Sequence, residues 1–247
     1  MQALRLTAAG HSQTGKRTQN EDNFCLHPDL QPDLAIFVVA DGMGGLQAGE
    51  EASKLAVDLI PNLIVERIQA KDRQDEAVAI ALEMVNQAIL QKAQEDSKFQ
   101  GMGTTAVVCL VTPTRVFIGN LGDSPAYLVR GTHVTRLTQD HTVTDELVRK
   151  GLLTAEQAKN HPWRNRLFKY LGCSELHELA EIHDYPPRPG DRLILTSDGV
   201  SNFIPDADYA ATIAKYPNPQ AAAEAFTQLA LDRGTKDNVT SLVIAFD

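Results

Sequence analysis

The sequence lacks long apolar runs, since no stretch of its 247 residues approaches the roughly eighteen consecutive apolar residues that a membrane helix needs. Its first residues also lack the cationic end and apolar stretch of a secretory signal. Both absences predict a protein of the cytoplasm that does not associate with membranes.

Cysteine is scarce. The chain has three cysteines, Cys25, Cys109 and Cys173, and none of them forms a CxxC pair. An odd number without such spacing argues against a disulfide framework and against a structural zinc site, so three free thiols are expected. The seven histidines are scattered and form no HExxH motif, which also disfavours zinc.

Positive charge is in deficit, with 23 lysines and arginines against 32 acidic residues and a formal net charge of −9. This balance is the wrong sign for a broad surface that neutralises nucleic-acid phosphates, so no nucleic-acid partner is expected. A phosphate-bearing substrate would need local help, which metal ions held by carboxylates can supply. The hydrophobic fraction of 43% is ample for a folded core.

Short runs rich in β-branched residues predict strands. They cover 34–40, 104–111, 115–121, 125–130, 133–138, 192–197 and 239–246, with a further short strand at 23–26. The junctions at 113–114 and 131–132 are short enough for hairpins, so the middle of the chain is expected to form an antiparallel meander.

Segments 49–69 and 74–95 repeat apolar residues every three or four positions, which predicts two amphipathic helices that pair against a sheet. Pro61 is expected to kink the first helix. A third helix is predicted to start at Pro219 after an Asn218 cap.

Residues 141–175 interrupt the strand rhythm with two short helical pieces and a basic, aromatic run. We interpret them as a flap inserted into a single domain that spans 1–247. Its apolar side chains are expected to pack against the domain: Trp163, Leu167 and Phe168. Its cations are interpreted as solvated, with contact to an acidic phosphoprotein as the alternative: Arg164, Arg166 and Lys169.

Aspartates stand next to the predicted strands. They are Asp22, Asp41, Asp123, Asp198 and Asp237. Strand ends at a shared sheet edge can converge in space, and a cluster of short carboxylates would repel strongly without a cation. Oxygen ligands suit Mg²⁺ or Mn²⁺, and the glycine after Asp41 lets the Gly42 carbonyl approach a metal ion. Two such ions could activate a water for in-line displacement at a phosphate.

Each motif is weak alone, because Asp-Gly is chiefly a turn signal. The alternative is that the five aspartates do not converge at all.

Together these residues resemble the metal-dependent type 2C protein serine/threonine phosphatase family, in its bacterial form. The matching motifs follow the family's order along nearly the whole chain: Arg17 with NED at 20–22, DGMGG at 41–45, GEEAS at 49–53, MGTTAV at 102–107, GNLGDS at 119–124, DHT at 140–142, PGDRLILTSDG at 189–199 and KDNVTSLVI at 236–244. The resemblance implies an α+β fold, a four-layer αββα sandwich of two antiparallel sheets flanked by helix pairs.

The resemblance also implies a binuclear Mn²⁺ or Mg²⁺ centre, with a third, weaker ion as in bacterial members of the family. This centre would hydrolyse phosphoserine and phosphothreonine in proteins phosphorylated by serine/threonine kinases. Its ligands would be Asp22, Asp41, the carbonyl of Gly42, Asp198 and Asp237, with Glu21 acting through water and Asp123 at the third ion. Arg17 would grip the substrate phosphate, because guanidinium pairs bidentately with phosphate oxygens. Its alternative is a solvated surface cation. A monomer is expected.

Two positions depart from the family pattern. Leu46 stands where many bacterial relatives carry a histidine after the Gly-Gly, so a histidine general acid is unavailable there. Pro125 stands where relatives commonly carry arginine, which puts local contacts in doubt but not Asp123.

Parts of the sequence also suggest three other functions. Cys109 and Arg115 have the spacing of cysteine-dependent phosphatases, but the intervening LVTPT lacks the glycines of a phosphate loop and Cys109 lies in an apolar run. A catalytically weak or inactive phosphatase-like binding module is the main alternative, with Leu46 as its support. A metal phosphodiesterase acting on nucleic acid is disfavoured by the acidic charge.

Overall fold

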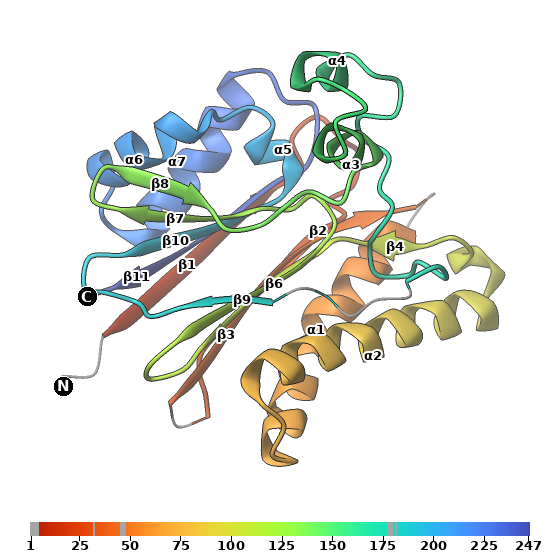
Figure 1. Ribbon diagram of the computed structural model, residues 1–247, viewed down its shortest axis with the longest axis horizontal. Helices are drawn as coiled ribbons and strands as arrows, with labels where there is room; N and C mark the ends of the chain where they lie inside the picture. The colour runs from red at the N-terminus through yellow and green to blue at the C-terminus, as the bar shows by residue number, and fades with distance from the viewer. Residues whose placement is uncertain (1–4, 32, 45–47, 177–179, 181) are drawn as a thin grey trace.

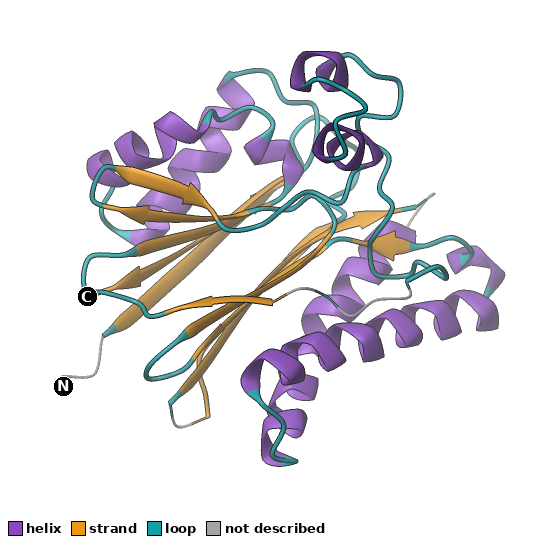
Figure 2. Ribbon diagram, in the orientation of Figure 1, coloured by secondary structure: helices purple, strands orange, loops and turns teal. Residues whose placement is uncertain are grey.

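The protein folds as two antiparallel β-sheets packed face to face between two helical layers (Figures 1 and 2). The structure is a computed structural model that describes residues 5–31, 33–44, 48–176, 180 and 182–247. The expected αββα sandwich is confirmed.

The first sheet has the strand order β1-β11-β10-β7-β8. Its strands are β1 (Leu6–Gln13), β11 (Val239–Phe246), β10 (Arg192–Thr196), β7 (Ala126–Arg130) and β8 (His133–Arg136). The second sheet has the order β2-β3-β5-β6-β9, with β4 paired to β3. These strands are β2 (Asp22–Gln31), β3 (Leu34–Met43), β5 (Ala106–Val111), β6 (Val116–Leu121), β9 (Ile182–Tyr185) and β4 (Gly103–Thr104).

The helices fall into three groups. The long pair α1 (Ala48–Gln69) and α2 (Gln74–Glu95) packs on the second sheet, and the short 3₁₀ helix η1 (Ser97–Phe99) follows it. The first sheet is covered by α5 (Asp198–Ser201), α6 (Asp206–Lys215) and α7 (Pro219–Asp232). The remaining pair, α3 (Val143–Arg149) and α4 (Ala155–Lys159), lies at the top of Figure 1.

Three hydrophobic clusters lie between the four layers, and strand β3 contributes side chains to two of them. Ile36 and Val38 face the cluster under α1 and α2, whereas Phe37 faces the cluster between the sheets. Because successive side chains of a strand point to opposite faces, a strand buried on both sides is apolar throughout. The third cluster, which includes Tyr209 and Phe226, lies between the first sheet and its helices.

The predicted helices are confirmed within a residue or two at each end. Pro61 is accommodated inside α1. Asn218 caps α7 by accepting a hydrogen bond from the backbone N–H of Ala221. Cys109 is a fully buried residue of β5, and all three cysteines are free.

The expected continuous meander is wrong. Hairpins β5–β6 and β7–β8 both form, but they belong to different sheets, because the chain crosses from one layer to the other at 122–125. Trp163 also differs from expectation, since half of its surface is exposed, whereas Leu167 and Phe168 are half-buried. Strands β1 and β9 and helix α6 were not anticipated, because short and mixed polar patterns give weak periodicity.

Candidate active site

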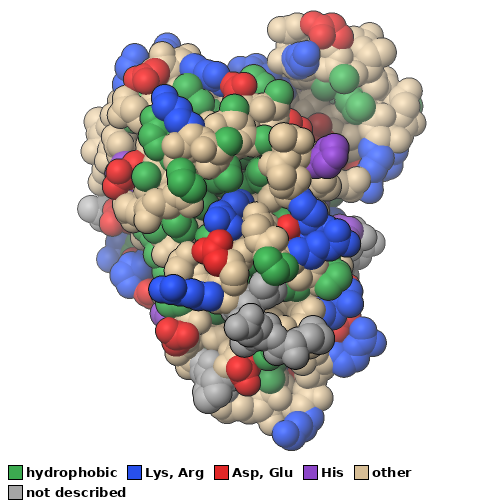
Figure 3. Space-filling view, turned by 90° about the vertical axis from the view of Figure 1, so that its left-hand side faces the viewer, with side chains coloured by type: hydrophobic (Ala, Val, Ile, Leu, Met, Phe, Trp, Pro, Cys, Tyr) green, Lys and Arg blue, Asp and Glu red, His purple; other side chains and the backbone are tan. Residues whose placement is uncertain are grey.

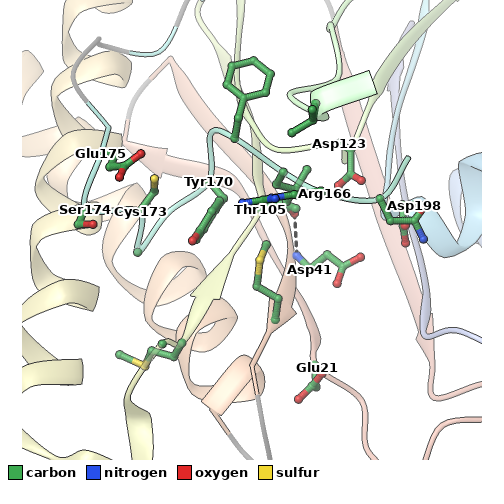
Figure 4. Close-up of a pocket in the computed structure, with 18 of the residues that line it drawn as sticks. Glu21, Asp41, Thr105, Asp123, Arg166, Tyr170, Cys173, Ser174, Glu175 and Asp198 are labelled. Atoms are coloured by element: carbon green, nitrogen blue, oxygen red, sulfur yellow. Dashed lines mark hydrogen bonds between the residues drawn. The ribbon is translucent and has the colours of Figure 1, made fainter. Parts of the chain in front are cut away.

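A cavity of about 1090 Å³ opens at one end of the two sheets. Six of the residues singled out in the sequence line it: Arg17, Glu21, Asp41, Asp123, Asp198 and Asp237. Figure 4 shows Asp123 and Asp198 on one side of Asp41, with Glu21 below it. Asp22 is not among the residues that line the cavity and is only 5% exposed. The expected convergence of the acidic residues is therefore observed.

Asp22 is held between the two sheets. It is the first residue of β2, yet its Oδ2 accepts hydrogen bonds from Ser197 Oγ and Thr240 Oγ1, both at 2.7 Å and both in the opposite sheet or at its end. Oδ1 of the same carboxylate is buried and has no hydrogen-bond partner. Buried carboxylate oxygens are rarely left unpaired, so Oδ1 is available to a cation.

Asp41 lies two residues before the end of β3, directly opposite Asp22 in the β2–β3 ladder. Its backbone N–H donates to Thr105 Oγ1 at 3.0 Å, and its carbonyl accepts from Thr105 N and Thr104 Oγ1, both at 2.9 Å. These three bonds fix the backbone and leave the carboxylate directed into the cavity (Figure 4).

Gly42 is buried beside Asp41 and donates its N–H to the carbonyl of Glu21 at 3.1 Å. A side chain at this position would collide with the backbone of Gly49 and of Glu21. Glycine therefore permits the close approach of three backbone segments under the cavity.

Asp198 and Asp237 come from the first sheet. Asp198 begins α5 immediately after β10 and its Oδ2 accepts from Asn202 Nδ2 at 3.2 Å. Asp237 precedes β11 and forms an ion pair with Arg17, whose Nη2 lies 2.9 Å from Oδ2. The Arg17 side chain is 57% exposed, so its guanidinium stands at the cavity mouth.

Asn238 ties the Arg17 loop to this site. Its Nδ2 donates to the carbonyls of Thr14 and Gln19, both at 2.8 Å, and its Oδ1 accepts from the N–H of Glu21 at 2.9 Å. Both N–H donors and the oxygen of this buried amide are thus used to hold 14–21 against the start of β11.

The carboxyl groups share an unfavourable environment. Burial, followed by repulsion from Asp198 and Asp237, raises the pKa of Asp22 to about 7, although two hydroxyls oppose the shift. Burial and Asp198 raise the pKa of Asp123 to about 8, and burial and Asp237 raise the pKa of Asp198 to about 6. The pKa of Asp41 is raised well above its ordinary value by burial and by Asp22. A cation placed among them would relieve this repulsion.

The donor set fits Mg²⁺ or Mn²⁺. It consists of carboxylate oxygens, which these hard ions prefer. Within the part of the chain that the structure describes, no group of three or more His, Cys, Asp or Glu side chains is arranged to hold a metal ion by itself. An open arrangement suits an ion that keeps several waters and takes only one or two carboxylates directly.

Sequence reasoning missed the residues that position these ligands: Thr105, Ser197, Asn238 and Thr240. Each lies inside a motif already noted, next to an aspartate in sequence or in the sheet. A hydroxyl or amide side chain near a strand-end acid was the feature of the sequence that could have indicated these residues. Its partner across the sheets could not be foreseen without the fold. Leu46 lies outside the described residues.

A four-layer sandwich with aspartates from both sheets gathered in one cavity is the architecture of a metal-dependent phosphatase. The family model described as Protein phosphatase 2C matches residues 9–233, so the chain belongs to the protein phosphatase 2C family.

Relatives and solved structures agree with this membership. The chain is 34% identical to a serine/threonine phosphatase stp of Listeria innocua, over 92% of this chain and 90% of that protein. It is 31% identical to protein phosphatase PhpP of Streptococcus pneumoniae, over 94% of each. The serine/threonine phosphatase PstP/Ppp of Mycobacterium tuberculosis superposes with a TM-score of 0.84 at 31% identity, covering 98% of this chain and 99% of that one.

A catalytic domain of a serine/threonine protein phosphatase PstP, solved in complex with two manganese ions, superposes with a TM-score of 0.79 at 30% identity, covering 98% of this chain and 99% of that one.

Proposed function

We propose that the cavity is the active site of a protein serine/threonine phosphatase that uses Mn²⁺ or Mg²⁺ to hydrolyse phosphoserine and phosphothreonine. The observation that carries the proposal is the Asp22 carboxylate, which is bonded across both sheets through Oδ2 and leaves Oδ1 unpaired beside Asp41. Relatives at 31–34% identity along nearly the whole chain are named as phosphatases of this kind.

Two ions would be held by Asp22, Asp41, the Gly42 carbonyl, Asp198 and Asp237, with Glu21 contributing through water and Asp123 serving a third ion. When bound, such ions lower the pKa of a water and offset the charge that develops on the phosphate oxygens. The protein's share is to hold the ligands rigidly: Ser197 and Thr240 bond the Asp22 carboxylate, and Thr105 bonds the backbone of Asp41.

Arg17 would bind the substrate phosphate. It already faces the cavity, and its Asp237 partner holds the pKa of the guanidinium above its usual value, so the charge is permanent. A cation held by Asp237 would compete with this ion pair, which would leave the guanidinium free to pair with phosphate oxygens. The exposed side chain has room for that movement.

The chain is proposed to be one catalytic domain with residues 141–175 as a flap, to act as a monomer on phosphoproteins in the cytoplasm, and to bind neither nucleic acid nor membrane. Within the described ranges, no helix has the length and apolar character to span a bilayer. On the face drawn in Figure 3, cationic side chains are interspersed with acidic ones, so that face is not a continuous basic surface.

The test is turnover of a phosphothreonine peptide with Mn²⁺ and with Mg²⁺, before and after a chelator. We expect chelator-sensitive release of phosphate, lost in Asp41→Ala and Asp198→Ala. Activity that survives both substitutions would contradict the metal site. Peptide binding without turnover at saturating Mn²⁺ would instead identify a phosphatase-like binding module.

A further inference from the structure

The cavity has a second half that the catalytic aspartates do not use. Beyond Asp41 it continues along α2 and the stretch that follows residue 168. Figure 4 shows Tyr170, Cys173, Ser174 and Glu175 on the side of Asp41 opposite Asp123 and Asp198. We name this half the side arm and define it by Leu90, Ala93, Met102, Tyr170 and Cys173.

The side arm is lined mainly by apolar side chains. Met102 is buried, Leu90 and Ala93 are half-buried on α2, and the Tyr170 ring forms the facing wall. Glu175, exposed at the far end, is the acidic side chain of this half. An apolar recess open to a charged site is suited to a side chain of the substrate, because burial removes apolar surface from water.

Tyr170 is held in place by close packing on glycine. A Cβ atom at Gly103 would lie 2.8 Å from Cδ2 and Cε2 of Tyr170, so the ring packs directly on the backbone of β4. The next residue, Leu171, exchanges two backbone hydrogen bonds of 2.9 Å with Thr104. The wall of the side arm is therefore an extension of the sheet.

Asn86 of α2 fixes the following turn. Its Oδ1 accepts from Gly172 N at 2.6 Å and its Nδ2 donates to the carbonyl of Cys173 at 3.3 Å. The buried amide joins the helix to the chain at 172–173. The side arm is thus fixed on both sides, by β4 and by α2.

Its distance from the catalytic carboxylates matches a short peptide. Gly42 pairs with Thr104 in β3–β4, and Thr104 pairs with Leu171, so two strand spacings separate the Asp41 region from the Tyr170 segment. Two spacings amount to about 10 Å, and an extended chain covers that in about three residues at ~3.3 Å each.

We propose that the side arm is a specificity subsite that receives an apolar side chain, Leu or larger, close in sequence to the phosphorylated residue. The inference rests on the proposed phosphatase function and adds the class of phosphoprotein sequence that is preferred. The Tyr170 ring and the α2 face at Leu90 and Ala93 form its two walls.

The test compares phosphothreonine peptides in a Ser/Gly background that carry a single Leu, moved through about three positions on either side of the phosphoresidue. At one position we expect the wild type to favour Leu over Ser by about tenfold in kcat/KM, the gain typical of filling an apolar pocket. Tyr170→Ala should bring that ratio to within about twofold while leaving turnover of the Ser peptide unchanged.

Ala93→Phe should also abolish the preference, because the larger side chain fills the side arm from α2 while Tyr170 itself is unchanged. Leu152→Ala is the matched control, since Leu152 is an exposed apolar residue of the same inserted segment that does not line the cavity. An equal fall in kcat/KM for the Leu and Ser peptides in Tyr170→Ala would show that Tyr170 has a structural role, and would overturn the proposal.

Wild-type hydrolysis with no preference at any position would leave the phosphatase function standing and overturn the subsite alone. Failure to hydrolyse any peptide with Mn²⁺ would overturn both.

Discussion

The aspartate cluster and the helices α3 and α4 of the 141–175 segment are held together in opposite ways. Asp22 is bonded to Ser197 and Thr240, which lie 175 and 218 residues away along the chain. Within 141–175, Glu146 pairs with Arg149 and Lys150 on its own helix, and Thr154 and Gln157 form a local capping box.

This difference has a physical consequence. Bonds between distant residues exist only when the whole fold is formed, so the geometry of the aspartates is as stable as the protein. Exposed ion pairs between neighbours contribute little, and substitutions among them affect little else. The cluster is therefore sensitive to small changes, whereas the outer surface of the segment tolerates them.

The largest effect is expected from the hydroxyls that hold Asp22. The double variant Ser197→Ala/Thr240→Val removes both donors to Oδ2 and should weaken Mn²⁺ binding by about 10–100-fold, the usual cost of losing partners behind a metal ligand. Calorimetric titration with Mn²⁺ measures this directly. Thr135→Val, at an exposed position of β8, is the control for the same chemical change. Unchanged affinity in the double variant would remove the positioning role.

A smaller effect is expected at Arg17, which lies at the cavity mouth. Arg17→Lys keeps the charge but loses the bidentate fork, and should raise KM for a phosphopeptide by about tenfold, a loss typical of one charge-assisted hydrogen bond. Mn²⁺ affinity should not fall, because the ion pair with Asp237 competes with the metal. The neighbouring exposed Lys16→Ala should change neither quantity. An unaltered KM would place Arg17 outside the substrate contacts.

The aspartate cluster should also make the stability of the protein depend on pH. The folded-state pKa values of Asp22 and Asp198 are raised to about 7 and about 6, so between about pH 4 and pH 7 the metal-free folded state binds more protons than the unfolded chain. The contribution of these groups therefore falls as pH rises through that window.

We expect the melting temperature of the chelated protein to fall from pH 5 to pH 8. Mn²⁺ should raise the melting temperature more at pH 8 than at pH 5, since protons compete with the metal. Asp22→Asn should flatten the chelated profile. A profile as steep as that of the wild type would show that Asp22 does not carry this effect. Thermal melts across pH, with and without Mn²⁺, measure all of these.

The smallest effect is expected on the outer side of the 141–175 segment. Leu152 is 67% exposed, so Leu152→Ser should alter the free energy of unfolding by no more than about 0.5 kcal/mol and leave peptide turnover unchanged. Denaturant unfolding of the two proteins is the measurement. A larger loss would mean that Leu152 is covered in solution.

The apolar patterns of the sequence predicted most of β3, β5 and β11 and the two long helices, whereas the sandwich itself was implied by the resemblance to the phosphatase family. The strand-end positions of Asp22, Asp41, Asp198 and Asp237 indicated that these residues could gather, but left open that they do not. The bonds from Ser197 and Thr240 could not be predicted, because they join two sheets whose mutual packing is not encoded locally. Likewise, the split of the central strands between sheets depends on a crossing at 122–125 that carries no periodic signal.

The hydrogen bonds of Asp22 to the opposite sheet place this proposed metal ligand at the interface between the two sheets. An ion coordinated there would cross-link the two sheets, since its ligands would come from β2 and β3 on one side and from beside β10 and β11 on the other. Loss of the ion would then weaken the contact between the two sheets. Amide hydrogen exchange should become faster in β2 and β11 before it becomes faster in the outer helices.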